Sequence, residues 1–205
     1  MRLLVPFDAL DPNTRLDPVL ADSDRAALAG CMLSDVIAAS RAAGARPTVL
    51  STEAVDCDAP VEVDERPLTP AVNDQLAAAT GPVAVVMADL ALATGRVLAD
   101  LFAASGDVVL APGRGGGTNA IVARHPDFQV DYHGVSIRDH LEAARTCGAS
   151  VRVVDSFRLA VDVDEPADLV EVLLHGAGRT VTWLREAGFA VDVVDGEPVL
   201  ARPDD

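Results

Sequence analysis

The sequence predicts an α/β fold in which helices cover a mostly parallel β-sheet. Short runs rich in valine, leucine and alanine alternate along the chain with longer amphipathic segments, a pattern typical of α/β sandwiches. Two of the runs, residues 82–87 and 108–111, are apolar without interruption, as expected for strands buried on both faces. The chain has 205 residues, half of them hydrophobic, which suits a single domain over residues 1–205.

The first half of the chain contains five of the expected strands and three helices. Apolar side chains at helical spacing predict a long helix with Ser23 as its N-cap and Gly44 as its stop. Thr69 and Pro70 resemble a cap followed by proline at the first helical position. The strands are expected at 2–6, 47–51, 61–63, 82–87 and 108–111, and the helices at 23–43, 69–79 and 95–104.

The second half begins with a glycine-rich loop at 112–119. Ser136 is expected to cap a helix, and Glu165-Pro166 to start another after an extended run that ends at Val161. Asp195-Gly196 predicts the turn of a C-terminal hairpin at about 189–201. The remaining elements are expected as strands at 120–124, 151–154, 190–194 and 198–200 and helices at 136–147, 165–174 and 179–187.

The charge balance is strongly acidic. The chain holds 24 Asp, 8 Glu, 16 Arg and no Lys, for a formal net charge of −16. Repulsion among so many like charges destabilises a compact chain at low ionic strength, whereas molar salt shortens the screening length from about 10 Å to about 3 Å. This composition resembles that of proteins from halophilic archaea. It also argues against a nucleic-acid polymer as partner, because phosphate contacts require clustered cations.

The cysteines and the hydropathy pattern favour a cytoplasmic protein. Cys31, Cys57 and Cys147 are widely spaced and form no C-x-x-C pair, so we expect small apolar side chains in a reducing compartment. No apolar run reaches the roughly 18 residues that a membrane span needs. We therefore expect no membrane partner and no signal peptide.

Three aspartates are the first candidates for chemistry. Asp162 and Asp164, at i and i+2 in an extended segment, point the same way, and Asp89 follows the most apolar predicted strand. Ligands of open α/β sheets bind beyond the carboxyl ends of the strands, so the three carboxylates are expected to converge there. Their mutual repulsion would be relieved by a cation, and Mg²⁺ is the expected metal. The alternative interpretation is that these aspartates only cap helices and turns.

The glycine-rich loop and one arginine are candidates for binding an anion. The loop PGRGGGTN offers many backbone N–H groups, and Arg114 adds a charge beside them. It is neither a Walker A loop nor a clean dinucleotide motif, and it could be only a flexible turn. Arg15 stands alone after the first strand, where it could equally pair with a nearby aspartate. Ser136 and His140 fit a cap and a helix face better than a nucleophile and its base.

Several motifs taken together resemble the archaeal 2-phospho-L-lactate guanylyltransferases, which have the nucleotide-diphospho-sugar-transferase-like fold. The matching segments are VPFDALDPNTRL, MLSDVI, VVMADLAL, APGRGGGTNA, YHGVS and DSFRLAVDVDEPADLVEVLLHG, in the family's order over nearly the whole chain. The resemblance implies a three-layer α/β/α sandwich. It also implies a GTP-dependent transfer that yields lactyl-2-diphospho-5′-guanosine in coenzyme F-420 biosynthesis.

The resemblance also assigns roles to residues. Asp89, Asp162 and Asp164 match the catalytic aspartates that hold the metal. Pro6, Arg15, Asn73 and Asp89 fall at the nucleotide site. Many relatives carry a lysine where this chain has Asp8, so Arg15, the metal or another arginine must help with the triphosphate. The family suggests a homodimer, with the terminal hairpin as a possible interface. The phosphorylated acid would be held by Gly116, Gly117, Thr118, Asn119, Gly134 and Ser136.

The residues suit this chemistry on their own terms. A phosphate nucleophile is already anionic at pH 7 and needs no general base, so positioning and charge neutralisation suffice. Phosphoenolpyruvate is an alternative acceptor that no residue here decides against. Two other interpretations stay open: a glycosyltransferase that uses the same DxD aspartates, and a nucleotide-binding module without catalysis.

Overall fold

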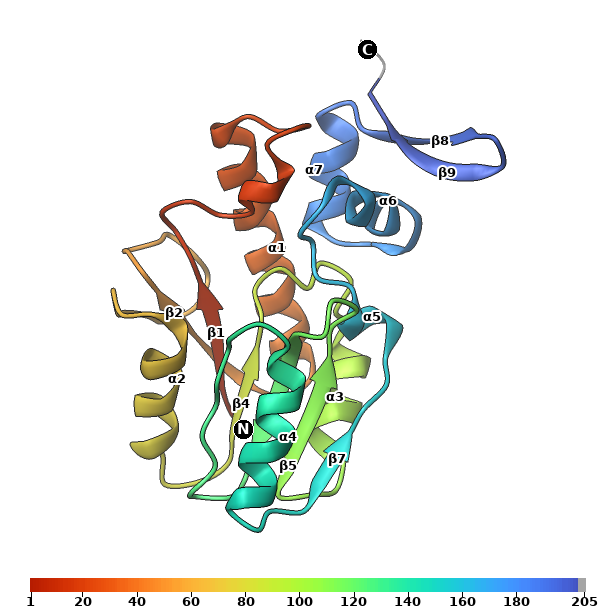
Figure 1. Ribbon diagram of the computed structural model, residues 1–205. Helices are drawn as coiled ribbons and strands as arrows, with labels where there is room; N and C mark the ends of the chain where they lie inside the picture. Colours follow the sequence, from red (N-terminus) through yellow and green to blue (C-terminus); the bar gives the residue numbers. More distant parts are fainter. Residues whose placement is uncertain (203–205) are drawn as a thin grey trace.

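The computed structural model describes residues 1–202 (Figure 1). Its centre is a seven-stranded sheet in the order β3-β2-β1-β4-β6-β5-β7. β6 runs antiparallel to its neighbours β4 and β5, and every other pair is parallel. The predicted mostly parallel sheet is confirmed. The strands are β1 (Arg2–Phe7), β2 (Arg46–Ser51), β3 (Val61–Val63), β4 (Val83–Val86), β5 (Val108–Pro112), β6 (Thr118–Ala123) and β7 (Val151–Val153).

Helices cover both faces of this sheet, which confirms the three-layer sandwich (Figure 1). α1 (Asp22–Ala42) and α3 (Gly95–Ala103) pack on one face, where Leu3 and Val5 of β1 join their core cluster. α2 (Leu68–Ala77) and α4 (Ser136–Thr146) pack on the other, where Leu4 is buried. Successive side chains of β1 therefore enter opposite cores, which explains why the strand is apolar throughout.

A third cluster of buried side chains lies beyond the carboxyl edge of the sheet. There α6 (Pro166–His175) and α7 (Arg179–Glu186) pack against the N-terminal half of α1. The short 3₁₀ helix η1 (Thr14–Leu16) contributes Leu16 to this core. These elements cover the edge of the sheet at which the parallel strands end.

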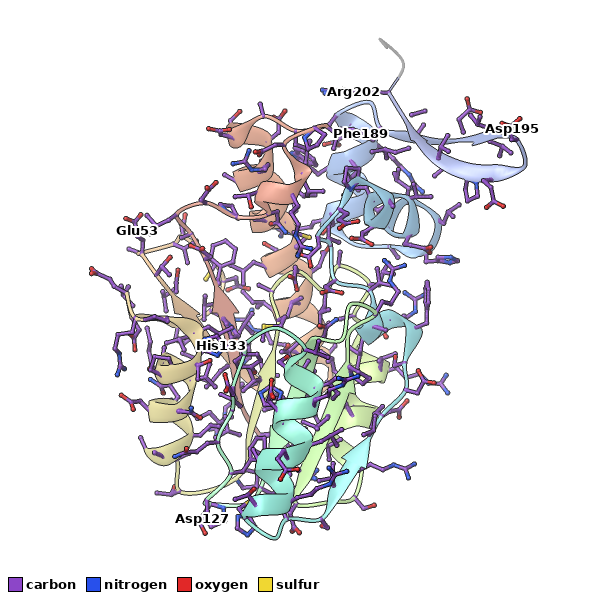
Figure 2. The ribbon with its side chains drawn as sticks, in the orientation of Figure 1. Glu53, Asp127, His133, Phe189, Asp195 and Arg202 are labelled. Atoms are coloured by element: carbon purple, nitrogen blue, oxygen red, sulfur yellow. The ribbon has the colours of Figure 1, made fainter. Side chains whose placement is uncertain are left out.

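The C-terminal hairpin consists of β8 (Ala190–Val194) and β9 (Glu197–Ala201), paired antiparallel. Figure 2 shows Asp195 at its far tip, and Phe189 with Arg202 where the hairpin joins α7. The Arg202 guanidinium lies 5.0 Å from the centre of the Phe189 ring, which fixes the base of the hairpin by a cation–π contact. The strands expected at 190–194 and 198–200 are present.

One expected element is wrong. The run that ends at Val161 is not extended from residue 159, because residues 157–160 form the short helix α5 (Phe157–Ala160). The Ser156 carbonyl accepts hydrogen bonds from the N–H groups of residues 159 and 160, at 3.1 and 2.9 Å, and closes a helical turn. The Asp162/Asp164 pair therefore follows a helix and does not end a strand. Residues 161–164 are nonetheless outside any helix, and the fully buried Val161 and Val163 alternate with the less buried Asp162 and Asp164.

Three expected caps also differ. α1 begins at Asp22, before Ser23, and α2 begins at Leu68, before Thr69. The Thr69 hydroxyl instead accepts a hydrogen bond from the Tyr132 N–H at 3.0 Å, so it serves a tertiary contact. Ser136 is the first helical residue of α4 and its side chain points inward. By contrast, Glu165 does cap α6, with Pro166 at the first helical position.

No helix in residues 1–202 is both long and apolar enough to cross a membrane.

Candidate active site

A cavity of about 610 Å³ opens at the carboxyl edge of the sheet. It lies between the loop after β1, the end of β4 and the start of α2, the place where open α/β sheets bind ligands (Figure 1). Four residues predicted for the nucleotide or the metal line it, namely Pro6, Arg15, Asp89 and Asp164.

Asp89 is the most perturbed acid of this cavity. Its Oδ1 is buried and has no hydrogen-bond partner within residues 1–202. Burial, reinforced by the nearby charges of Asp162 and Asp164, raises the pKa of Asp89 to about 7. A carboxylate oxygen in this condition is energetically costly unless a cation or a donor reaches it.

The Asp162/Asp164 pair is tied to Asp89 through the backbone. The Val163 N–H donates to the Asp89 carbonyl at 3.2 Å, and the Val163 carbonyl accepts from Asn13 Nδ2 at 2.8 Å. Asp162 and Asp164 act on Asp89 through their charges, although the pair does not end a strand and the three carboxylates do not form a metal-binding cluster in the described part of the chain. Burial and Asp162 raise the pKa of Asp164, while Arg15 opposes this shift.

Arg15 forms an ion pair with Asp164 and lies 3.8 Å from Glu165. Its side chain is 61% exposed, so it can exchange this partner for a ligand at little cost. Arg15 therefore lines the cavity and is paired with an aspartate, and its role in binding an anion stays a prediction.

The fit of these residues to a metal ion is partial in this conformation. The orphaned Asp89 oxygen beside two further carboxylates is the environment that a cation stabilises. Among residues 1–202, however, no three His, Cys, Asp or Glu side chains are close enough together to hold a metal.

Asp168 holds the backbone that follows the Asp162/Asp164 pair in place. No sequence pattern singled out this residue. Its Oδ2 accepts the N–H groups of Asp164 and Glu165 at 3.0 and 2.8 Å, which is the capping box of α6. Its Oδ1 accepts from Arg114 of the glycine-rich loop. Arg114, expected beside an anion, therefore fastens the loop to the aspartate segment.

Backbone hydrogen bonds close the glycine-rich loop into a turn and leave some of its backbone N–H groups free of backbone partners in residues 1–202. The N–H groups of Gly113, Arg114 and Gly116 are bonded to backbone carbonyls at 3.0–3.1 Å. Those of Gly115 and Gly117 show no backbone partner in the described part of the chain. A Cβ at Gly115 would meet nothing within 4 Å, so a ligand can approach the backbone there.

The loop docks on the start of α4. The Gly116 carbonyl accepts from the Ile137 N–H at 3.2 Å, and Gly116 adopts φ +84° with Val135 packed against it. This contact brings Thr118 and Ser136 together, with 3.4 Å between their hydroxyl oxygens. Gly134, at φ +50°, forms the bend that leads the chain into α4.

Two predicted asparagines have structural contacts. Asn73 exchanges hydrogen bonds with the backbone of Val130, at 2.9 and 2.8 Å, and lines a different cavity from the aspartates. Asn119 is buried and donates to the Leu159 carbonyl at 2.9 Å, which links the glycine-rich loop to α5. Asn73 therefore lies outside the cavity expected for the nucleotide.

No sequence pattern singled out Arg66, a second arginine of the cavity. It lines the cavity and is paired with Asp64 and Asp74. Asp8 accepts hydrogen bonds from the Leu10 N–H and the Thr52 hydroxyl, each at 3.1 Å. Arg15 and Arg66 are the cations that this cavity offers among its described lining residues.

The model of the guanylyl transferase CofC-like family matches residues 1–200. The chain belongs to this family. A 2-phospho-L-lactate guanylyltransferase of Halomicrobium mukohataei is 62% identical over 203 residues, covering 99% of this chain and 100% of that protein. The enzyme of the same name from Natronomonas pharaonis is 56% identical, covering 98% and 99%.

Solved structures share the fold of this CofC-like chain. A Desulfovibrio desulfuricans protein, described as a candidate nucleotide-diphospho-sugar transferase, superposes with a TM-score of 0.69 at 16% identity, over 90% of this chain and 94% of that one. A nucleotidyl transferase from Methanothermobacter gives 0.58 at 16% identity, over 91% and 99%. The family and fold expected from the motifs are confirmed.

Proposed function

We propose that this protein joins the GMP moiety of GTP to 2-phospho-L-lactate. The products are lactyl-2-diphospho-5′-guanosine and pyrophosphate, and the reaction belongs to coenzyme F-420 biosynthesis. The observation that carries the proposal is the buried carboxylate oxygen of Asp89, which has no hydrogen-bond partner in residues 1–202 and lies with Asp164 and Arg15 in a cavity of a CofC-like chain. Relatives that bear this enzyme's name match almost the whole chain.

The residues divide the work between two adjoining places. The cavity takes GTP, with Arg15 and Arg66 near the triphosphate and Pro6 at the end of β1. The glycine-rich loop, Thr118 and Ser136 hold the phosphorylated acid. Asp89, Asp162 and Asp164 would hold Mg²⁺, either directly or through water, and the ion would supply charge neutralisation and alignment of the phosphates.

The transfer itself needs no protein base. A phosphate oxygen of the acceptor forms a bond to the α-phosphorus of GTP while the bond from that phosphorus to the bridging oxygen breaks. Pyrophosphate leaves with the electron pair. Arg15 must give up Asp164 as the triphosphate arrives, which costs little because the arginine is largely exposed.

The surroundings in which the enzyme works are part of the proposal. The net charge of −16 supports a salt-rich cytoplasm, in agreement with the free cysteines among the described residues. We propose a homodimer formed through the C-terminal hairpin, where Val193 and Val194 are exposed at 65% and 52%.

Pyrophosphate release separates an enzyme from a nucleotide-binding module. The assay uses the wild type, Asp162→Asn and Asp100→Asn in molar KCl with Mg²⁺, GTP and 2-phospho-L-lactate. Asp100 is exposed on α3 and has no hydrogen bond or ion pair with any described side chain, so it is the matched control. We expect Asp162→Asn to lose at least about a hundredfold in rate because a metal ligand is gone, and Asp100→Asn to match the wild type. Equal rates for Asp162→Asn and the wild type would refute the metal role.

A further inference from the structure

His140 is a fully buried histidine with no role in the function proposed so far. It lies on α4, one turn after Ser136, and both of its ring nitrogens have partners. The Asp131 N–H donates to His140 Nε2 at 3.0 Å, and His140 Nδ1 lies 2.8 Å from Thr118 Oγ1. Phe128 and Tyr132 pack against the ring.

These partners fix the tautomer of His140. A backbone N–H can only donate, so Nε2 must be the acceptor and Nδ1 must carry the proton of the neutral ring. Nδ1–H therefore donates to the Thr118 hydroxyl oxygen. Burial lowers the pKa of His140 to about 4, against the opposing charges of Asp131 and Asp139, so the ring is neutral at working pH.

Because His140 is the donor in this bond, it determines whether the Thr118 and Ser136 hydroxyls can donate a hydrogen bond to a ligand. Thr118 and Ser136 have two hydroxyl protons and one contact between them, 3.4 Å long. Because His140 already donates into the pair, one hydroxyl proton is left over whichever hydroxyl donates to the other. In the other tautomer Nδ1 would accept the Thr118 proton. As long as the Ser136 hydroxyl donates to Thr118, no proton would then be left for a ligand, and the pair would present lone pairs that repel an anion.

We propose that His140 is a positioning residue that keeps the Thr118/Ser136 pair a hydrogen-bond donor to the phosphorylated acid. The inference rests on the proposed function, because it takes this pair as part of the acceptor site. Its neighbourhood suits an anion: the N–H groups of Gly115 and Gly117 are without backbone partners in residues 1–202, and the space beside Gly115 is open. His140 itself does not touch the substrate.

Steady-state kinetics of four proteins test this role. The full-length wild type, His140→Phe, His140→Asn and His175→Phe are compared in molar KCl with Mg²⁺. Phenylalanine keeps an aromatic ring against Tyr132 but cannot donate, whereas asparagine keeps an N–H near the place of Nδ1. His175 is a half-exposed histidine of α6 and controls for the substitution itself.

We expect His140→Phe to raise KM for 2-phospho-L-lactate about tenfold or more, with KM for GTP within about twofold. His140→Asn should recover most of the acceptor affinity, and His175→Phe should match the wild type. An unchanged acceptor KM in folded His140→Phe, or an equal rise in both KM values, would overturn the inference. A wild type without turnover would overturn the proposed function and the positioning role together.

The tautomer can be read without any activity. In ¹⁵N NMR of the wild type, His140 should show a protonated Nδ1 and an unprotonated Nε2 between pH 6 and 8. Protonation of Nε2 instead would refute the donor chain, even if His140→Phe fails to fold.

Discussion

Asp89 is the side chain on which the proposed metal site depends most. Its position after an uninterrupted apolar run was enough to predict that it lies at the carboxyl edge of the sheet. The sequence could not reveal that its Oδ1 lacks a partner, because that depends on residues 162–164 arriving from a distant part of the chain. The shift of its pKa is thus a tertiary property.

Replacement of Asp89 by asparagine should stabilise the metal-free protein. The folded-state pKa of about 7 lies above the value of a free aspartate, so the folded wild type binds protons more tightly than the unfolded chain and loses stability as pH rises from about 4 to 7. Asparagine carries no charge and escapes this loss. In EDTA we expect Asp89→Asn to melt a few degrees above the wild type at pH 8, and by a smaller margin at pH 5. Thermal melts in which the variant melts lower at pH 8 would contradict the buried-carboxylate argument.

Helices and loops show where sequence patterns suffice. Glu165-Pro166 marked the start of α6 correctly, because proline at the first helical position is a local signal. Residues 157–160 form α5 although the apolar run suited a strand equally well, since four residues are too few to define a period. Asp35 stands in the apolar stripe of α1 for a reason outside that helix: its carboxylate accepts the N–H groups of Arg179 and Thr180 and so caps α7.

The link between the glycine-rich loop and α6 predicts a joint effect on stability and catalysis. Asp168 accepts two backbone N–H groups and Arg114 while almost fully buried. Removal of its carboxylate leaves these donors unsatisfied, so Asp168→Ala should lower the free energy of unfolding by about 2 kcal/mol. It should also slow pyrophosphate release, because the Asp162/Asp164 segment loses its support.

Urea denaturation in molar KCl measures the first effect, and Asp100→Ala is the control. That exposed helical position should change the unfolding free energy by no more than about 0.5 kcal/mol. If Asp168→Ala and Asp100→Ala had the same free energy of unfolding, the contacts of Asp168 would not stabilise the fold.

For the whole molecule, alternation of strands and helices predicted the layers but not the strand order. β6 enters antiparallel between β4 and β5, so its first residues meet the ends of both strands: Thr118 pairs with Pro112 of β5 and Ala120 with Val86 of β4. The Asn119 carbonyl then accepts the Met87 N–H at 3.0 Å, which ties the end of the glycine-rich loop to the segment that leads to Asp89, and no local pattern encodes this. Solved structures at 16% identity share the fold, which indicates that layer packing constrains the sequence weakly.

The net charge of −16 makes a prediction for the molecule as a whole. Repulsion among its carboxylates weakens as added salt shortens the screening length, and the folded state gains more than the extended unfolded chain. The melting temperature should therefore rise between about 0.1 and 2 M KCl, as followed by circular dichroism. A melting temperature that falls across this range would remove the argument for a salt-rich cytoplasm.

The reaction proposed for this site is the transfer of a guanylyl group to a small phosphorylated acid. The most direct test is pyrophosphate release by the wild type in molar KCl with Mg²⁺, with GTP, ATP, CTP or UTP paired with 2-phospho-L-lactate or phosphoenolpyruvate. We expect pyrophosphate release to be fastest with GTP and 2-phospho-L-lactate, and to stop after chelation of the metal. Absence of release with every pair, or transfer from a nucleotide sugar in its place, would contradict this proposal.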